Sequence, residues 1–273
     1  MTRNQSIGVF DSSLGGLTIL RALVERLPHY RYVYLGDTAR APYGDRSREE
    51  ILRFSKEAID FLFKEGCELV IFACNTVSAE ALRSIQQGYL KERYGGRKRV
   101  LGVIVPTVEH VASDSSRRKV GVLGTRGTVE SGTYREEFKK IAPHIEVVQN
   151  AAPLLVPLVE AGEQGTERAE GLVKESVEPF LRAGVDTVIL GCTHYEHLLP
   201  ELKRALGESA TIVSQSGVVA DKLAGYLARH PEMEETLSLA GGVTFYTTDT
   251  TGRFERESAR FFGRAVEARE AKL

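Results

Sequence analysis

Short apolar runs alternate along the chain with longer stretches in which apolar residues recur every three to four positions. The alternation predicts strands followed by amphipathic helices, and therefore a parallel sheet flanked by helices. Polar residues are nearly absent from the runs, as expected for strands that are covered on both faces. In the first half of the chain the expected strands are residues 6–10, 30–36, 69–73 and 100–105, and the expected helices are residues 16–27, 47–66 and 78–95.

The second half of the chain repeats this layout with few identical residues. "SIGVFDSS" matches "KVGVLGTR", "YRYVYLGD" matches "HIEVVQNA", and "FLFKEGCELVIFACNT" matches "FLRAGVDTVILGCTH". In the third match Gly66 corresponds to Gly184, and Cys74 corresponds to Cys192. Three matches in the same order predict two similar parallel-sheet α/β domains. We expect a pseudo-twofold axis to relate them.

Cys74 and Cys192 each stand just after an expected strand. Ligands of parallel α/β sheets bind outside the carboxyl ends of the strands. If the strand ends of the two domains face each other, the two cysteines lie on opposite walls of one cleft, where we expect the active site. Cys67 has no such counterpart, because Val185 stands at the matching position. We therefore predict that Cys67 only packs.

The composition excludes several classes of protein. Of the 273 residues 42% are hydrophobic and 27% are charged, and the formal net charge is −1. A chain this close to neutrality has no field that would recruit nucleic acid or an acidic membrane surface. The N-terminus has no apolar stretch of signal-peptide length, and no run approaches the ~18 apolar residues of a membrane span, so we expect a cytoplasmic protein. Three cysteines do not indicate a disulfide framework.

Three other interpretations of the two cysteines stay open. Both thiols could simply fill core space, because free cysteine is among the most buried residue types. Cys192 and His194 could bind zinc, although their spacing is tight and the chain has no Cys-x-x-Cys pair, so we expect no metal. One cysteine could be the nucleophile of a Cys–His hydrolase, which would leave the other unexplained.

Two thiols facing each other suit the removal of a proton from one face of a carbon and the return of a proton to the other face. Thiol and thiolate are both accessible near neutral pH, since the ordinary cysteine pKa is about 8.5. Asp11, Glu160 and His194 are the candidate polar assistants. The alternatives are a helix cap for Asp11, a solvated helix face for Glu160 and a hydrogen-bonded core imidazole for His194.

Two turns are candidates for holding the carboxylates of an amino-acid substrate. "DSSLGG" (11–16) enters an expected helix, and "APYGDRS" (41–47) forms a second small loop. Backbone N–H groups in such turns suit an anion. The chain contains neither G-x-x-x-x-G-K-[ST] nor G-x-G-x-x-G, so we expect no phosphate-bearing cofactor.

Five segments together resemble the glutamate racemases of bacteria, within the aspartate/glutamate racemase superfamily. They are "GVFDSSLGGLTIL", "YLGDTARAPYG", "ACNT", "PLVEAG" and "LGCTHY", and the resemblance continues to "FYTTDTTGRF" near the C-terminus. It implies a cofactor-independent proton transfer that interconverts L- and D-glutamate and supplies D-glutamate for peptidoglycan. The implied partner is this small-molecule substrate. A homodimer stays open as the assembly.

The resemblance also implies a role for each site residue. Cys74 and Cys192 would be the two acid/base thiols, with Cys192 facing the proton of L-glutamate and Cys74 that of D-glutamate. Asp11, Glu160 and His194 would assist them. The residues implied to contact the substrate are Asp11, Ser12, Tyr43, Gly44, Asn75, Thr76, Thr193 and His194. The implied domains are residues 1–98 plus 210–273, and residues 99–209.

Two residues depart from the family pattern. Ser13 replaces the glycine of the usual "DSG" turn, which leaves the shape of the carboxylate cradle open, and Glu196 stands where proline is common after "CTHY". Aspartate racemases typically carry an acidic residue where His194 stands, which favours glutamate. Two alternatives remain: an aspartate or other racemase, or a decarboxylase, of the same superfamily, and a non-catalytic two-domain ligand-binding protein.

Overall fold

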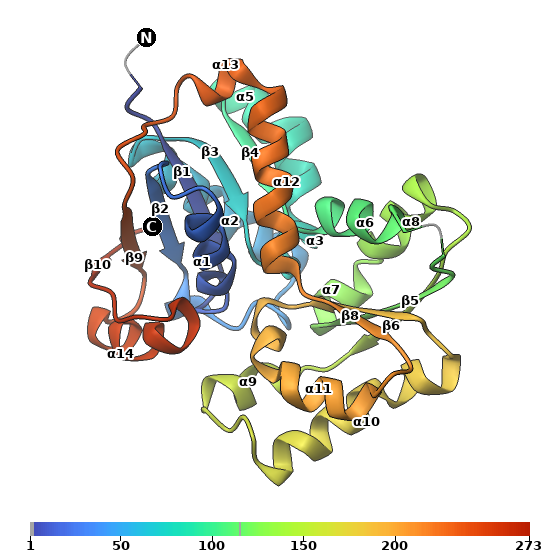
Figure 1. Cartoon of the computed structure of the whole chain (residues 1–273). Coiled ribbons are helices and arrows are strands. Elements are labelled where there is room, and N and C mark those ends of the chain that lie inside the picture. The colour runs from blue at the N-terminus through green and yellow to red at the C-terminus, as the bar shows by residue number, and fades with distance from the viewer. Residues whose placement is uncertain (1–2, 115) are drawn as a thin grey trace. The chain divides into compact units, whose positions relative to one another are not determined.

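Two parallel sheets organise the chain in a computed structural model that describes residues 3–114 and 116–273 (Figure 1). A six-stranded sheet, in the order β10-β9-β2-β1-β3-β4, belongs to a first unit made of the residues up to Val103 and Ser216–Leu273. A four-stranded sheet, in the order β6-β5-β7-β8, belongs to a second unit, Ile104–Gln215. Neighbouring strands are parallel throughout both sheets. The predicted fold class, two parallel-sheet α/β domains, is confirmed.

The first unit begins with alternating strands and helices and is completed by the last part of the chain. Its strands are β1 Ser6–Asp11, β2 Tyr32–Gly36, β3 Cys67–Phe72, β4 Arg99–Gly102, β9 Val243–Thr247 and β10 Ala268–Glu270. Its helices are α1 Gly16–Arg26, η1 Thr38–Arg40, α2 Arg48–Lys64, α3 Asn75–Glu80, α4 Leu82–Ser84, the π segment η2 Ile85–Tyr89, α5 Leu90–Tyr94, α12 Gln215–Arg229, α13 Pro231–Glu234 and α14 Thr251–Phe262. The first residue of α12, Gln215, belongs to the second unit.

Strand β1 lies at the centre of the first sheet, and every residue of it is buried. Because successive side chains point to opposite faces, Phe10 joins the core under α2 while Ile7 and Val9 point to the other face. On that other face Tyr34 of β2 packs its ring 6.0 Å from Phe254 of α14. The sheet is thus covered on both sides, as its apolar strands predict.

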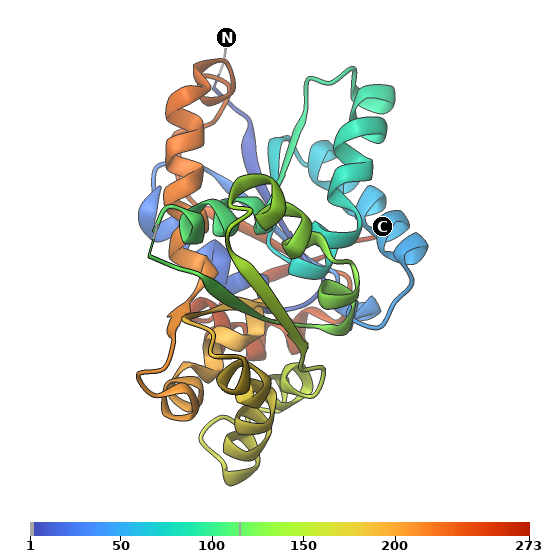
Figure 2. The same ribbon diagram turned by 90° about the vertical axis from the view of Figure 1, so that its right-hand side faces the viewer.

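The second unit has the same layered build. Its elements are β5 Lys119–Gly124, β6 Glu146–Ala151, β7 Thr187–Gly191, β8 Thr211–Val213, α6 Ile104–Ala112, α7 Arg126–Glu130, α8 Thr133–Ile141, α9 Leu155–Glu160, α10 Glu167–Ala183, the 3₁₀ helix η3 Thr193–Leu198 and α11 Leu199–Leu206. Figures 1 and 2 both show α6 and α8, in green, on one face of this sheet and α10 and α11, in yellow to orange, on the other.

The predicted internal repeat is visible in the strand order. Within each sheet the first strand of the repeat, β1 or β5, lies between the second and the third. The helix before the third strand has 17 residues in both units, and a hydroxyl N-cap, Ser47 or Thr166, begins it. A glycine in the left-handed region follows each helix, Gly66 at φ 85° and Gly184 at φ 65°. No helix of the described ranges is long and apolar enough to cross a membrane.

Two expected elements are wrong in part. The strand expected at residues 100–105 ends at Gly102, and α6 begins at Ile104. The ladder stops there because Gly102 pairs with Phe72, the last residue of β3. The single helix expected at residues 78–95 starts earlier, at Asn75, and is divided into α3, α4, a π segment and α5. Its N-terminus therefore directly follows Cys74.

Candidate active site

Asp11, Ser12 and Cys74 come together because β1 and β3 are neighbours. The pairing of Phe10 with Phe72 continues when the N–H of Ala73 donates to the carbonyl of Phe10 at 2.9 Å. Both strands end at this edge, so Ser12 Oγ lies 3.4 Å from Cys74 Sγ. Both side chains are buried, with 8% and 6% of their surface exposed. The hydroxyl is a polar neighbour that can donate a hydrogen bond to the sulfur or accept one from it.

The turn after β1 is held by Asp11, which is almost fully buried. Its Oδ1 accepts the N–H of Ser13 at 2.9 Å, while the carbonyl of Ser13 accepts the Tyr34 hydroxyl at 2.8 Å. Both contacts use the backbone of Ser13, which does not have a positive φ, so serine fits where the family pattern has glycine. The helix-cap alternative for Asp11 is not what the geometry gives, since α1 has Gly15 as its N-cap and no side-chain cap.

Gly16, the first residue of α1, leaves no room for a larger side chain. A Cβ at this position would lie 2.4 Å from Cβ and 2.9 Å from Cγ of Asp11. Such a contact is too short, so an alanine here must displace Asp11 or the start of the helix. The second glycine of the "DSSLGG" motif thus serves the placement of the carboxylate.

Gly16→Ala should destabilise the protein by about 1–3 kcal/mol and lower the activity, because Asp11 is pushed from its place. Gly171→Ala is the matched control, since a methyl group added to Gly171, within α10, would meet no atom within 4 Å. Alanine there should stabilise the protein by about 0.5–1 kcal/mol. Urea unfolding and kcat/KM of both variants check this. Equal effects of the two substitutions would contradict it.

Tyr43 is fixed by a buried carboxylate that is missing from the residues predicted from sequence. Asp37 follows β2, is fully buried, and donates its N–H to the carbonyl of Asp11 at 3.0 Å. Its carboxylate accepts the hydroxyls of Tyr43 and Thr248 and the Nε–H of Arg40. Burial, and then the charge of Asp37, raise the pKa of Tyr43 far above its ordinary value. A carboxylate directly after the strand in "YLGD" was the signal for this residue.

The other residues predicted to contact substrate in the first unit lie on the same edge of the sheet. Gly44 follows Tyr43 and is partly exposed, whereas Asn75 and Thr76, in the first turn of α3, are 2% exposed each. The structure thus brings together, within one unit, the predicted residues Asp11, Ser12, Tyr43, Gly44, Cys74, Asn75 and Thr76.

In the second unit, Cys192, His194 and Glu160 form one line of contacts. β7 ends at Gly191, and the 3₁₀ helix η3 then begins at Thr193. His194 Nδ1 lies 3.8 Å from Cys192 Sγ, and its Nε2 lies 3.2 Å from Glu160 Oε1. Glu160 is the last residue of α9, and its side chain is 29% exposed, whereas His194 and Thr193 are buried. The imidazole can therefore hold a positive charge between the sulfur and the carboxylate.

The electrostatics favour that charge. Burial alone would lower the pKa of His194, but the hydrogen bonds to Cys192 and Glu160, and then their charges, raise it to about 10. The imidazolium form therefore persists at neutral pH.

Tyr195 fixes η3 to the sheet. It is fully buried, and its hydroxyl donates to the carbonyl of Ala152 at 2.8 Å, with the carbonyl of Gly124 at 3.2 Å. These carbonyls lie at the carboxyl ends of β6 and β5. The segment that carries Cys192 and His194 is therefore tied to three neighbouring strands.

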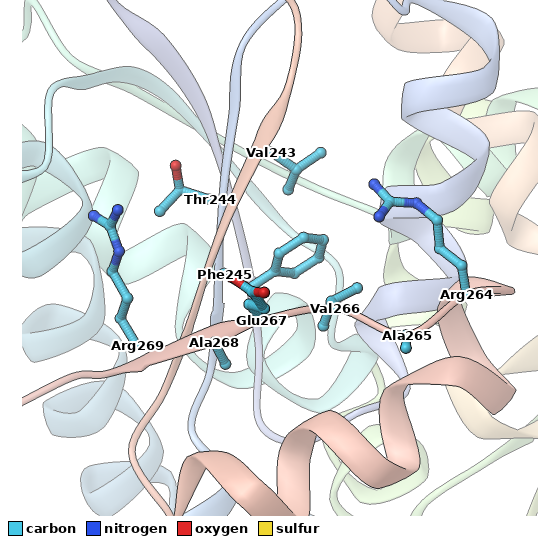
Figure 3. Close-up of a pocket in the computed structure, with 9 residues that line it drawn as sticks. All are labelled: Val243, Thr244, Phe245, Arg264, Ala265, Val266, Glu267, Ala268 and Arg269. Atoms are coloured by element: carbon cyan, nitrogen blue, oxygen red, sulfur yellow. The ribbon is translucent and has the colours of Figure 1, made fainter.

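Two features of the molecule lie apart from these residues. Cys67 is fully buried, and burial raises the pKa of its thiol to about 12, as expected for a packing residue. A hollow on the first unit is lined by β9 and residues 264–269, with Arg264 and Arg269 at its two sides (Figure 3). None of its lining residues is a predicted site residue. Within residues 3–114 and 116–273, no cluster of three or more His, Cys, Asp or Glu could hold a metal ion.

Comparisons with known proteins agree with one another. The family model described as Asp/Glu/Hydantoin racemase matches residues 7–219. The glutamate racemase of Bacillus cereus is 36% identical over 267 residues, which cover 98% of this chain and 96% of that protein. A glutamate racemase isoform of Bacillus anthracis has a TM-score of 0.91 at 32% identity, over 100% of this chain and 99% of that one. The Francisella tularensis glutamate racemase, solved with D-glutamate, has a TM-score of 0.87 at 30% identity, over 100% and 98%.

Proposed function

The chain belongs to the Asp/Glu/Hydantoin racemase family and, within it, to the glutamate racemases, and from this we propose that Cys74 and Cys192 exchange the α-proton of glutamate without a cofactor. The observation that carries the proposal is the repeat of one arrangement. Each unit places a cysteine after the third strand of its repeat, beside a polar partner. The proposal requires both strand ends to face one substrate from opposite sides.

The reaction begins with a thiolate on one side and a thiol on the other. The thiolate of Cys192 takes the α-proton of L-glutamate, and the C–H electron pair stays on the α-carbon. The thiol of Cys74 then gives its proton to the opposite face, which yields D-glutamate and leaves the thiolate on Cys74. The reverse direction exchanges the two roles, so one proton is taken and one is returned in each turnover.

The polar neighbours have different tasks on the two sides. His194, held by Glu160, places an imidazole beside Cys192, whereas Ser12 offers Cys74 a neutral hydroxyl. Proton transfer by a positioned side chain contributes roughly 10²–10⁴-fold to the rate. The remainder must come from donors that stabilise the negative charge developing on the α-carbon and its carboxylate. We propose Ser12, Tyr43, Gly44, Asn75, Thr76 and Thr193, with Asp11 and His194, as the substrate-binding set.

D-Glutamate made in this way would serve peptidoglycan synthesis in the cytoplasm of a bacterium. This part of the proposal rests on membership of the glutamate racemases. Loss of the encoding gene should then make growth depend on added D-glutamate.

The substrate prediction is a preference for glutamate over aspartate. One methylene separates the two amino acids, and such a difference is worth about 10–200-fold in kcat/KM. We expect at least about tenfold in favour of glutamate. Protein dialysed against a chelator, with an absorption scan for bound pyridoxal phosphate, should be assayed by optical rotation with both amino acids. Equal rates, a preference for aspartate, or activity restored only by a metal would contradict the proposal, and unchanged L-glutamate would indicate a binding protein.

A further inference from the structure

Gln215 is a buried amide at the point where the chain leaves the second unit. It is 1% exposed, and Ser216 already belongs to the first unit. Its Nε2 donates to the hydroxyl of Tyr134 at 2.9 Å and to Oγ1 of Thr107 at 3.0 Å. Tyr134 and Thr107 are themselves fully buried. The amide thus joins α8 and α6 to the first residue of α12.

Tyr134 connects this amide to the residue before Cys192. A Cβ added to Gly191 would lie 3.5 Å from Cε2 of the Tyr134 ring, so the ring packs against that backbone. Burial raises the pKa of Tyr134, the hydrogen bond to Gln215 lowers it, and the charge of Cys192 raises it, so the hydroxyl lies within electrostatic range of the sulfur. Movement of Tyr134 would therefore displace the backbone at the end of β7.

Glu196 connects the backbone of Gln215 to the far end of the segment Gly191–Glu196, which carries Cys192 and His194. Its Oε1 accepts the N–H of Gln215 at 2.8 Å. Glu196 stands two residues after His194 in the 3₁₀ helix η3. This is the position at which the chain departs from the proline common in the family pattern, and a proline could not make this contact.

We propose that Gln215 is a positioning residue that holds the segment Gly191–Glu196 from both ends, through Tyr134 and Glu196, and so sets the place of Cys192 and His194 for proton transfer. The argument rests on the proposed two-thiol reaction. It assigns Glu196, a departure from the family pattern, a definite use. Cys74 belongs to the other unit, so its own geometry should be indifferent to Gln215.

The test uses this difference between the two thiols. Gln215→Met keeps the length of the side chain and removes the amide that donates to Tyr134 and Thr107, while the backbone N–H that donates to Glu196 stays. We expect kcat to fall about 10- to 100-fold, because small misplacements of a reacting group have effects of this order. Transfer at Cys192 should become the slower step in both directions. The substrate isotope effect should then rise with α-deuterated L-glutamate, whose C–D bond Cys192 breaks, and fall with α-deuterated D-glutamate.

Four further variants keep the test decisive. Tyr134→Phe and Glu196→Ala each remove one arm and should shift the isotope effects in the same sense, whereas Glu196→Gln keeps an oxygen acceptor and should restore the pattern. Gln149→Met is the matched control, because Gln149 lies in the same unit and donates to the carbonyl of Val129 at 3.0 Å. It should leave both isotope effects unchanged. Isotope effects that change equally in both directions, or not at all, in Gln215→Met and in both single-arm variants would overturn the proposal.

A second measurement separates this proposal from the proposed function. Alkylation by iodoacetamide, followed at each cysteine by peptide mass spectrometry, needs no turnover of glutamate. Gln215→Met should slow alkylation at Cys192 several-fold and leave Cys74 unchanged. If alkylation follows this pattern but the parent protein does not racemise glutamate, only the proposed function is overturned. The positioning role alone would be overturned if the parent enzyme racemises glutamate normally and each cysteine is alkylated at the same rate in the variant as in the parent.

Discussion

Racemisation of glutamate should fall by about 10²–10⁴-fold when either Cys74 or Cys192 is replaced by alanine, because each thiol is proposed to be the group that takes or gives the proton on its side. The two losses should be similar, since every turnover needs both thiols. In D₂O the parent enzyme should convert L-glutamate early in the reaction to D-glutamate with deuterium at the α-carbon, while the remaining L-glutamate keeps its protium. The proton that Cys74 donates has exchanged with solvent and is not the one that Cys192 removed.

Cys67→Ala is the matched control for both variants. Cys67 is buried like the other two cysteines, with 0% of its surface exposed against 6% and 7%, and lies in the core under α2. Its loss should cost about 1 kcal/mol of stability through lost packing, with kcat/KM nearly unchanged. NMR of the α-position and a kinetic comparison of the three variants check the prediction. A Cys74→Ala enzyme that still racemises, or product that retains the original protium, would exclude a mechanism with two thiols.

His194→Asn should lower kcat/KM at neutral pH on the order of 10²–10³-fold, as the loss of a preorganised charge does at other active sites. The reason is the imidazolium between Cys192 and Glu160. Because these two partners raise the pKa of His194 to about 10, the charge is present at neutral pH and is lost as the pH rises through that value. The ratio of parent to variant activity should be constant near pH 7 and shrink as the pH approaches and passes 10.

Rates measured from about pH 6.5 to about pH 10.5, on both sides of that pKa, test this sign. Glu160→Gln should act in the same direction with a smaller effect, because it removes one of the two partners that hold the proton on His194. His144→Asn, at an exposed turn before β6, makes the same chemical change away from the site and should leave the profile unchanged. A ratio that grows with pH would contradict the assignment of an imidazolium.

The pattern of apolar residues was sufficient for much of the fold. Alternating runs predict parallel sheets, as observed. The match of Cys74 with Cys192 predicts that both thiols follow equivalent strands, and β3 and β7 do occupy equivalent places in the two sheets. The errors arose where tertiary context decides. The strand expected at residues 100–105 was predicted to extend too far. Its apolar residues continue into α6, whereas its partner β3 ends at Phe72.

The site was harder to predict wherever a contact joins residues that are distant in the sequence. His194 and Glu160 were both named as candidate assistants, but the contact between them was not predicted, and nothing in the spacing of Glu160 alone distinguishes it from a solvated helix residue. Asp37 carries a local signal, a carboxylate after an apolar strand. Gln215 carries none, because its importance lies in Thr107 and Tyr134, which only the packing of α6 and α8 brings to it.

The insertion of the second unit into the first also bears on how the protein is made. On the ribosome, β1 to β4 emerge early, but β9, which pairs with the full length of β2, emerges only after the whole second unit has been synthesised. Until then β2 presents an unpaired edge of buried, apolar sequence, "YVYLG", to its surroundings. Such edges are templates for aggregation of nascent chains, and a chaperone bound there would protect them. The same insertion that carries the second thiol therefore prolongs the time for which the first half of the enzyme is vulnerable.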